Sequence, residues 1–220
     1  MQNFNPCTAA DLCLSEGACG CCDWHRRCSR AWTIIRIVGT VNPQRPYIAL
    51  YPSGVVNNEE RKYHWAFLIG PKVQKGRPGL YGIRCHVKNQ LSPSPNGPSR
   101  PRWEYEELAL NDVRNTNNLL IRIMIGKIIN AKNLLQTLRS VPVVQGDPEW
   151  RCRSWCADAL VALERDGQAM GASVLDWRRI EELTRRHVRE KIAQGRFDDS
   201  WLLVNPKPTW DLWENKEVIA

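Results

Sequence analysis

Residues Asp147–Trp155 read Asp-Pro-Glu-Trp-Arg-Cys-Arg-Ser-Trp, and the prediction of the fold starts from this stretch. Asp147 is a good helix N-cap, Pro148 suits the first helical position and Gly167 supplies a C-terminal stop, so the pattern predicts a helix. Cys152 would lie in about its first turn, where the helix dipole and unpaired N–H groups favour a thiolate. This position predicts a nucleophile, although a cysteine on the buried side of the helix fits the same pattern.

Two histidines precede this helix, in stretches rich in strand-forming residues. His64 lies in Tyr63–Gly70 and His86 lies in Arg84–Lys88. If the two strands are neighbours, both imidazoles can share a face with Cys152, with His64 as the base and His86 fixing its tautomer. A histidine hydrogen-bonded to a neighbouring loop would account for His64 equally well. The carboxylates that could replace His86 are Asp147, Asp158 and Glu104.

Other residues near the predicted nucleophile are assigned to substrate binding or packing. Asp158 follows Cys152 by six residues and lies on a different side of the same helix, so it is interpreted as a separate substrate-binding or structural carboxylate. Trp65 and Trp155 are expected to pack around the site and to border the substrate. Cys156, one turn further along the helix, is expected in the core.

The composition divides the chain into an appendage and a domain. The 220 residues are 43% hydrophobic, a content typical of a globular protein. Their formal net charge is +8. Six of the nine cysteines fall in the first 28 residues, so residues 1–45 are interpreted as a poorly ordered appendage and residues 46–220 as one α+β domain. The cluster between Cys13 and Cys28 matches no paired zinc spacing, and no metal or cofactor is predicted. Trp201–Trp213 is expected to pack back as a strap.

Hydrophobic periodicity and turn residues give a coarse secondary structure. The expected strands are 46–51, 63–70, 81–88 and 103–108. Ser92–Pro101 is interpreted as a surface loop, and Leu119–Ile129 fits either a strand or a buried helix. Further helices are expected at Asn130–Leu138, with Asn130 as N-cap, and at Ser173–Gln194.

Several function classes are not predicted because their motifs are missing from the sequence. There is no Gly-rich phosphate loop, His-Glu-x-x-His, Gly-x-Ser-x-Gly or dinucleotide fingerprint, which argues against kinases, dehydrogenases and serine hydrolases. The sequence has neither an apolar stretch long enough to cross a bilayer nor the pattern of a secretory signal. We expect a cytoplasmic protein with reduced thiols and no membrane partner.

Basic residues concentrate in one segment near the C-terminus. Six arginine or lysine residues fall between Arg178 and Lys191. Such a run forms either a solvated helix face or a docking surface for a polyanion such as RNA. Arg178, Arg185 and Arg189 are expected to face solvent and, in the second case, to bind the substrate's phosphates.

The order of the histidines and the cysteine resembles that of the lecithin:retinol acyltransferase-like proteins, which have a permuted papain-like arrangement. There, a strand with a histidine is followed by a second histidine and by a cysteine at a helix start. Here these are Tyr63–Gly70 with His64, then His86, then Arg151–Trp155 with Cys152. The resemblance implies a papain-like α+β fold, with an antiparallel sheet packed on helices and Cys152, His64 and His86 as catalytic residues.

A second resemblance spans most of residues 46–177. The chain is similar to a group of small fungal proteins that distantly resemble the fungal arginine-containing cyclodipeptide synthases. The motifs concerned are Tyr47–Gly54, Tyr63–Ala66, His86–Asn89, Asp147–Trp155 and Ser173–Trp177. The acidic Asp-Asp-x-x-Glu motif of those synthases corresponds here to a stretch with one aspartate, Asp158, and with Val161 in place of the glutamate. The resemblance implies the coupling of two aminoacyl groups from aminoacyl-tRNA into a diketopiperazine.

These observations predict a Cys–His acyl-transfer enzyme, most specifically a cyclodipeptide-synthase-like enzyme of fungal secondary metabolism. Its partners would be aminoacyl-tRNA and a small-molecule or peptide substrate. One alternative is a Cys–His hydrolase of peptides or amides, which needs no basic docking surface. The other is a non-catalytic binding protein on the same fold, in which Cys152 is buried out of reach of both histidines.

Overall fold

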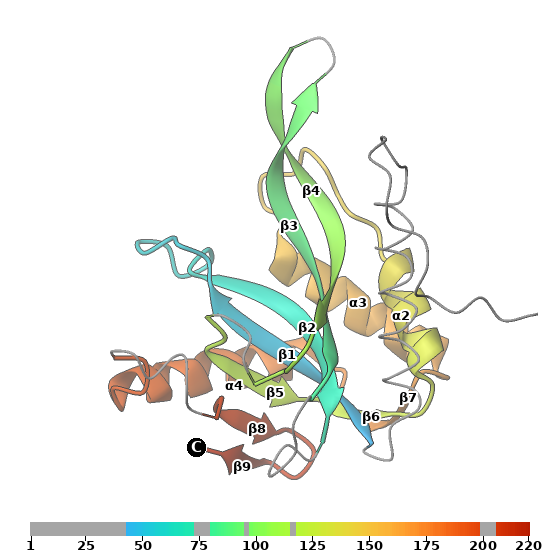
Figure 1. Ribbon diagram of the computed structural model, residues 1–220, viewed down its shortest axis with the longest axis vertical. Coiled ribbons are helices and arrows are strands. Elements are labelled where there is room, and N and C mark those ends of the chain that lie inside the picture. The colour runs from blue at the N-terminus through green and yellow to red at the C-terminus, as the bar shows by residue number, and fades with distance from the viewer. Residues whose placement is uncertain (1–42, 73–79, 95–96, 115–117, 199–205) are drawn as a thin grey trace, which may run out of the picture.

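The computed structural model describes residues 43–72, 80–94, 97–114, 118–198 and 206–220. The predictions for the Cys-rich segment and for Trp201 fall outside these ranges. Within them the chain combines a large, mostly antiparallel sheet with three helices (Figure 1). The α+β class predicted from the sequence is therefore confirmed.

The described strands form one large sheet and one small one. Their bounds are β1 Gln44–Pro52, β2 Tyr63–Pro71, β3 Gly82–Ser94, β4 Gly97–Leu110, β5 Ile121–Met124, β6 Gly126–Ile128, β7 Met170–Ser173, β8 Thr209–Asp211 and β9 Lys216–Ile219. The large sheet has the order β4-β3-β2-β1-β5-β8-β9. Its neighbours are antiparallel except β5 and β8, which run parallel. The small sheet pairs β6 with β7.

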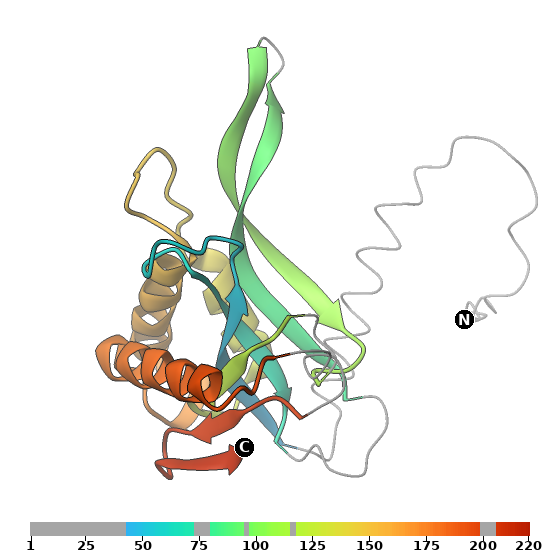
Figure 2. The same cartoon turned by 90° about the vertical axis from the view of Figure 1, so that its left-hand side faces the viewer.

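The helices cover one face of the large sheet (Figure 2). Their bounds are α2 Ala131–Ser140, α3 Cys152–Asp166 and α4 Trp177–Ala193. Residues of all three join Ile48 and Leu50 of β1 in one hydrophobic cluster. Tyr47 and Ala49 alternate with these and point to the other face, where Leu80 and Val113 contribute to a second cluster. None of the helices in the described ranges has the length and apolar character needed to cross a membrane.

Aromatic packing holds the start of α3 against the sheet. Trp155 is fully buried, and its ring centroid lies 5.9 Å from that of Phe67 on β2 and 5.5 Å from that of Tyr105 on β4. Cys152 lies three residues before Trp155. The same packing therefore places Cys152 beside the strands that carry the two histidines.

The start of α3 differs from the prediction. We expected Asp147 to cap the helix and Pro148 to open it, but Cys152 is the first helical residue and Arg151 is the N-cap. The carboxylate of Asp147 accepts the backbone N–H of Glu149 at 2.8 Å, so it closes a turn of its own instead of capping the helix. Cys152 is therefore the N-terminal residue of α3, nearer to the helix end than we expected.

Other helix limits agree better with the sequence. Gly167 ends α3 in the left-handed conformation with φ 62°, which costs glycine little. Asn130 caps α2, and its side chain accepts a backbone N–H from the first turn. Helix α4, expected to begin at Ser173, begins at Trp177 because Asp176 is its N-cap and the preceding residues belong to β7.

Strands β3 and β4 form a long hairpin that projects from the body of the molecule (Figure 1). The prediction of a loop at Ser92–Pro101 is wrong, because Leu91 pairs with Pro101 and Ser92 with Arg100. Strand β4 lies at the edge of the sheet, where prolines are tolerated within a strand. The loop-like composition therefore concealed a continuation of the hairpin.

The first strand, the ambiguous segment and the C-terminal strap differ in detail from the elements expected from the sequence. Strand β1 starts at Gln44, two residues before the first strand expected from the sequence. The ambiguous segment Leu119–Ile129 contains the short strands β5 and β6. In the described part of the C-terminal strap, β8 joins the sheet and Trp210 packs against the core, whereas Trp213 is 59% exposed.

Candidate active site

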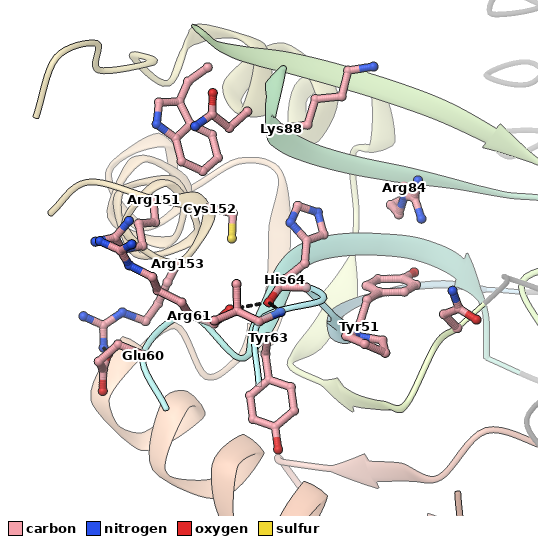
Figure 3. Close-up of a pocket in the computed structure, with 16 residues that line it drawn as sticks. Tyr51, Glu60, Arg61, Tyr63, His64, Arg84, Lys88, Arg151, Cys152 and Arg153 are labelled. Carbon is pink, nitrogen blue, oxygen red and sulfur yellow. Dashed lines mark hydrogen bonds and ion pairs between the residues drawn. The ribbon is translucent and has the colours of Figure 1, made fainter. Parts of the chain in front are cut away.

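A pocket of about 490 Å³ lies where the start of α3 meets the sheet. Cys152 and His64 both line it and point into it from α3 and β2 (Figure 3). The pocket also has Tyr51 of β1, Arg84 of β3 and Arg151 at the start of α3 in its wall. The structure therefore brings the predicted nucleophile and the predicted base to one cavity.

His64 and His86 are in direct contact, as the sequence predicted. Nε2 of His64 lies 2.7 Å from Nδ1 of His86. On the other side, Nε2 of His86 lies 3.0 Å from a carboxylate oxygen of Glu106, its cross-strand partner on β4. The three side chains form a continuous line from the pocket to the edge of the sheet.

The carboxylate at the end of this line was missed in the sequence. We considered Glu104, but Glu104 bonds Gln90 and Ser92 instead. Glu106 faces His86 because the β3–β4 register pairs these two positions. The register shifts by one residue between Ser92 and Ser94, so the position of the turn alone would not have identified this pair from the sequence.

Glu106 is held in its ionised form. Burial acts to raise its pKa, but hydrogen bonds from Lys88 and His86 outweigh this effect and keep the pKa below its usual value. The ammonium of Lys88 lies 2.8 Å from the second carboxylate oxygen. An ionised carboxylate can only accept hydrogen bonds, so it requires the proton of His86 to be on Nε2.

Both imidazoles are neutral at pH 7. Burial, together with the charges of His86 and Arg84, lowers the pKa of His64 to about 3. Burial also lowers the pKa of His86, even though Glu106 acts in the opposite direction.

The hydrogen bonds then determine the tautomer of each ring. His86 donates from Nε2 to Glu106, so its Nδ1 is an acceptor and must receive the proton of Nε2 of His64. In a neutral ring this leaves Nδ1 of His64 with a free electron pair. Nδ1 of His64 is therefore unprotonated and able to accept a hydrogen bond or a proton.

The Cys152 thiol is protonated at rest, contrary to the expectation from its place at a helix start. Only 7% of the residue is exposed, and burial raises the pKa of Cys152, although backbone N–H groups of Trp65 and Arg153 act to lower it. The sulfur accepts the N–H of Trp65 at 3.4 Å. Among the described residues no hydrogen bond joins the sulfur to His64, so direct proton transfer would require the two groups to come closer than they are at rest.

Several predicted substrate-binding residues lie outside the pocket wall. Trp65 and Trp155 are buried to 1% and 0% exposure and serve as packing around the site. Asp158 is exposed and lies away from the pocket, on another side of α3, as its spacing predicted. Cys156 is fully buried in the core, as expected.

The basic segment of α4 is largely occupied by ion pairs. Arg178 and Arg189 are exposed as predicted, but Arg185 is not solvent-facing. Its guanidinium bonds Glu181 at 2.8 Å and Glu60 at 3.2 Å, and its side chain is only 16% exposed. These carboxylates come from α4 and from the β1–β2 connection, so Arg185 holds two parts of the fold together.

In the ranges that the structure describes, no group of histidine, cysteine and acidic side chains is arranged to hold a metal ion. The Cys-rich cluster considered for zinc lies outside those ranges.

The fold and the line of side chains define an α+β protein with a cysteine, two histidines and a glutamate at one pocket. A family model matches residues 44–219, and the chain belongs to that family, DUF6914, a family of unknown function. No curated protein and no solved structure matches the chain. The matched region begins at the first residue of β1 and ends at the last residue of β9, so it contains the whole pocket.

Proposed function

We propose that the protein is a Cys–His acyl-transfer enzyme in which Cys152 is the nucleophile and His64 the general base. The observation that carries the proposal is the line from His64 through His86 to Glu106, which leaves a free electron pair on Nδ1 of His64. His86 is a positioning residue, and Glu106 fixes its tautomer. His64 also lines a pocket that contains a cysteine, which a merely structural hydrogen bond between two histidines would not require.

The reaction would proceed through an acyl-enzyme. As the thiol proton moves to Nδ1 of His64, the sulfur of Cys152 bonds the carbonyl carbon of an ester, thioester or amide. The bond to the leaving group then breaks, and the leaving group takes the proton from His64. Water or an amine next attacks the thioester, gives a proton to His64 and releases Cys152, which regains its proton. N–H groups in the first turn of α3 have no partner within the helix and could stabilise the oxyanion.

The arrangement of the chain is compatible with the permuted papain-like fold that the resemblance implied. The histidines lie on the consecutive antiparallel strands β2 and β3, and the cysteine follows at the start of a helix that packs on that sheet. This order supports the fold proposal and provides the elements of a cysteine acyl-transfer site.

The nature of the acyl acceptor separates the two enzyme hypotheses. Coupling of aminoacyl groups from tRNA would require a basic docking surface, and the ion pairs of Arg185 with Glu181 and Glu60 reduce the free charge available on α4. Arg178 and Arg189 remain exposed for this role, although Arg178 pairs with Glu182 at 3.1 Å. A hydrolase would use water as the acyl acceptor and needs no such surface. Measuring the affinity for tRNA therefore distinguishes the two enzyme hypotheses.

Alkylation with iodoacetamide near neutral pH tests the proposal. Cys152 lines the pocket and has a neighbouring base, so it should react much faster than Cys156, which lies one turn further along α3 with 0% exposure. Mass spectrometry of wild type, Cys152→Ser and the matched control Cys156→Ser measures both rates. Equally slow labelling of the two cysteines in the folded protein would exclude Cys152 as a nucleophile and favour a binding protein.

A further inference from the structure

The pocket has an excess of positive charge. Its wall contains five arginine or lysine side chains and one glutamate, Glu60. Most of these cations have partners: Lys88 pairs with Glu106, and Arg153 pairs with Glu60 and Glu181. The negative charge of Glu60 is therefore already shared with neighbours.

Arg151 and Arg61 are also engaged or peripheral. The guanidinium of Arg151 donates to the carbonyl oxygen of Pro148 at 2.7 Å and lies 3.9 Å from Glu149. Arg61 has no ion pair within the described residues, but its side chain is exposed to solvent, which can solvate its charge.

Arg84 differs from the other cations. It lies two residues before His86 on β3, hence on the same face, and it is half-buried in the pocket wall. Its guanidinium lies 5.1 Å from the ring centroid of Tyr51, which holds it in place. Its Nε is buried without a hydrogen-bond partner, and within the described chain it forms no ion pair.

The buried Nε–H of Arg84 lacks the acceptor that buried polar groups usually have, and a ligand in the pocket could supply it. The five N–H donors of arginine form a rigid fork that matches the two oxygens of a carboxylate. Figure 3 shows Arg84 on the far side of His64 from Cys152, at the other end of the same cavity. A substrate could therefore place a carboxylate on Arg84 and a carbonyl carbon at Cys152.

We infer that the pocket selects acyl substrates that carry a carboxylate, and that Arg84 is the residue that binds it. This inference rests on the proposed function, because it assigns the substrate class of the same site. Arg84 is the half-buried guanidinium without an ion pair in the described pocket wall, and its planar fork matches the two oxygens of one carboxylate.

Binding of the carboxylate would also affect the base. The charge of Arg84 is one of the causes that lower the pKa of His64. A carboxylate on Arg84 would offset that charge and strengthen His64 as a proton acceptor. The correct substrate would thus both occupy the pocket and activate its base.

A pair of thiol reagents of nearly equal shape tests the inference: N-(2-carboxyethyl)maleimide and its carboxamide analogue. The ratio of their labelling rates at Cys152, divided by the same ratio for free cysteine, cancels the intrinsic reactivity of the thiol. We expect a normalised ratio of about ten in favour of the acid, the size of one charge-assisted contact. Arg84→Gln should reduce the ratio to about one, whereas Arg84→Lys, which keeps the charge, should retain part of it.

Arg165→Gln is the matched control, because it removes one positive charge from an exposed position in the last turn of α3, at the opposite end of that helix from Cys152. It should leave the ratio unchanged. A wild-type ratio near one, or an unchanged ratio in Arg84→Gln, would overturn the inference while rapid labelling of Cys152 still upheld the proposed function. Slow labelling of Cys152 by both reagents would instead contradict the proposed function. Inorganic phosphate protecting Cys152 better than acetate would refute the assignment of a carboxylate.

Discussion

Lowering the pH from 7 to 5 should destabilise the protein through the buried imidazole of His64. The pKa of this ring is about 3 in the folded protein and 6.5 in the unfolded chain, so the unfolded chain binds the proton more readily. The stability that depends on neutral His64 is therefore present above pH 6.5 and is lost as the pH falls below it. From these two values the loss between pH 7 and pH 5 is about 2 kcal/mol.

Urea unfolding at pH 5, 6 and 7 measures this effect. Wild type should lose more stability than His64→Asn over the interval, and the difference should be about 2 kcal/mol. Comparing slopes removes any constant cost of the substitution. His86 and His187 also have lowered pKa values, but they contribute to the slope of both proteins.

Arg178→Gln should follow the wild-type slope, since its side chain is exposed and remains charged in this pH range. Parallel curves for wild type and His64→Asn would show that His64 is not kept neutral by burial. The tautomer argument would then fail, because a charged ring has no free electron pair.

Three further results are expected. Glu106→Gln should slow the acylation of Cys152 without changing the fold. The rate should fall less than in His64→Asn, which removes a base that accelerates the reaction about a hundredfold or more. An unchanged acylation rate in a stopped-flow assay would exclude a role for Glu106. Trp155→Ala should lower the free energy of unfolding by roughly 3–5 kcal/mol. An unchanged urea midpoint would show that Trp155 does not hold α3 against the sheet. If aminoacyl-tRNA is the donor, tRNA affinity should fall about a thousandfold between 50 and 200 mM salt. Arg178→Glu with Arg189→Glu should abolish that binding in gel shifts, and absent or salt-insensitive binding by wild type would remove tRNA as donor.

The strands and the histidine pair could be predicted because their signals are local. Tyr63–Gly70 is rich in strand-forming residues, and the next such stretch follows after a short connection containing Gly-Pro. Consecutive strands of this kind usually pair, which brought His64 to His86. The helix end at Gly167 was predictable for the same reason, since only the adjacent residues decide it.

The missing parts of the site depend on long-range geometry. Glu106 is two residues from the carboxylate we considered, and the β3–β4 register alone decides which of them meets His86. The composition of Ser92–Pro101 predicted a loop where the hairpin in fact continues. The register of β3 and β4 therefore could not be deduced from the sequence. The orientation of Arg185 depends on Glu60, which is distant in the sequence.

The protonation state of Cys152 was misjudged because a helix start and a buried position act in opposite directions. The sequence showed the first, which favours the thiolate, whereas the second, the burial of Cys152 between α3 and the sheet, became visible only in the structure. In the proposed mechanism the protonated thiol therefore needs a base, the role proposed for His64.

Formation of an acyl-enzyme at Cys152 tests the central claim most directly. The folded protein is mixed with p-nitrophenyl acetate, the burst of p-nitrophenol is followed, and the acylated residue is located by tandem mass spectrometry. We predict a burst with one acetyl group on Cys152, absent in Cys152→Ser and strongly slowed in His64→Asn. Acetylation confined to lysines, or a burst that Cys152→Ser does not change, would contradict the assignment of Cys152 as the nucleophile.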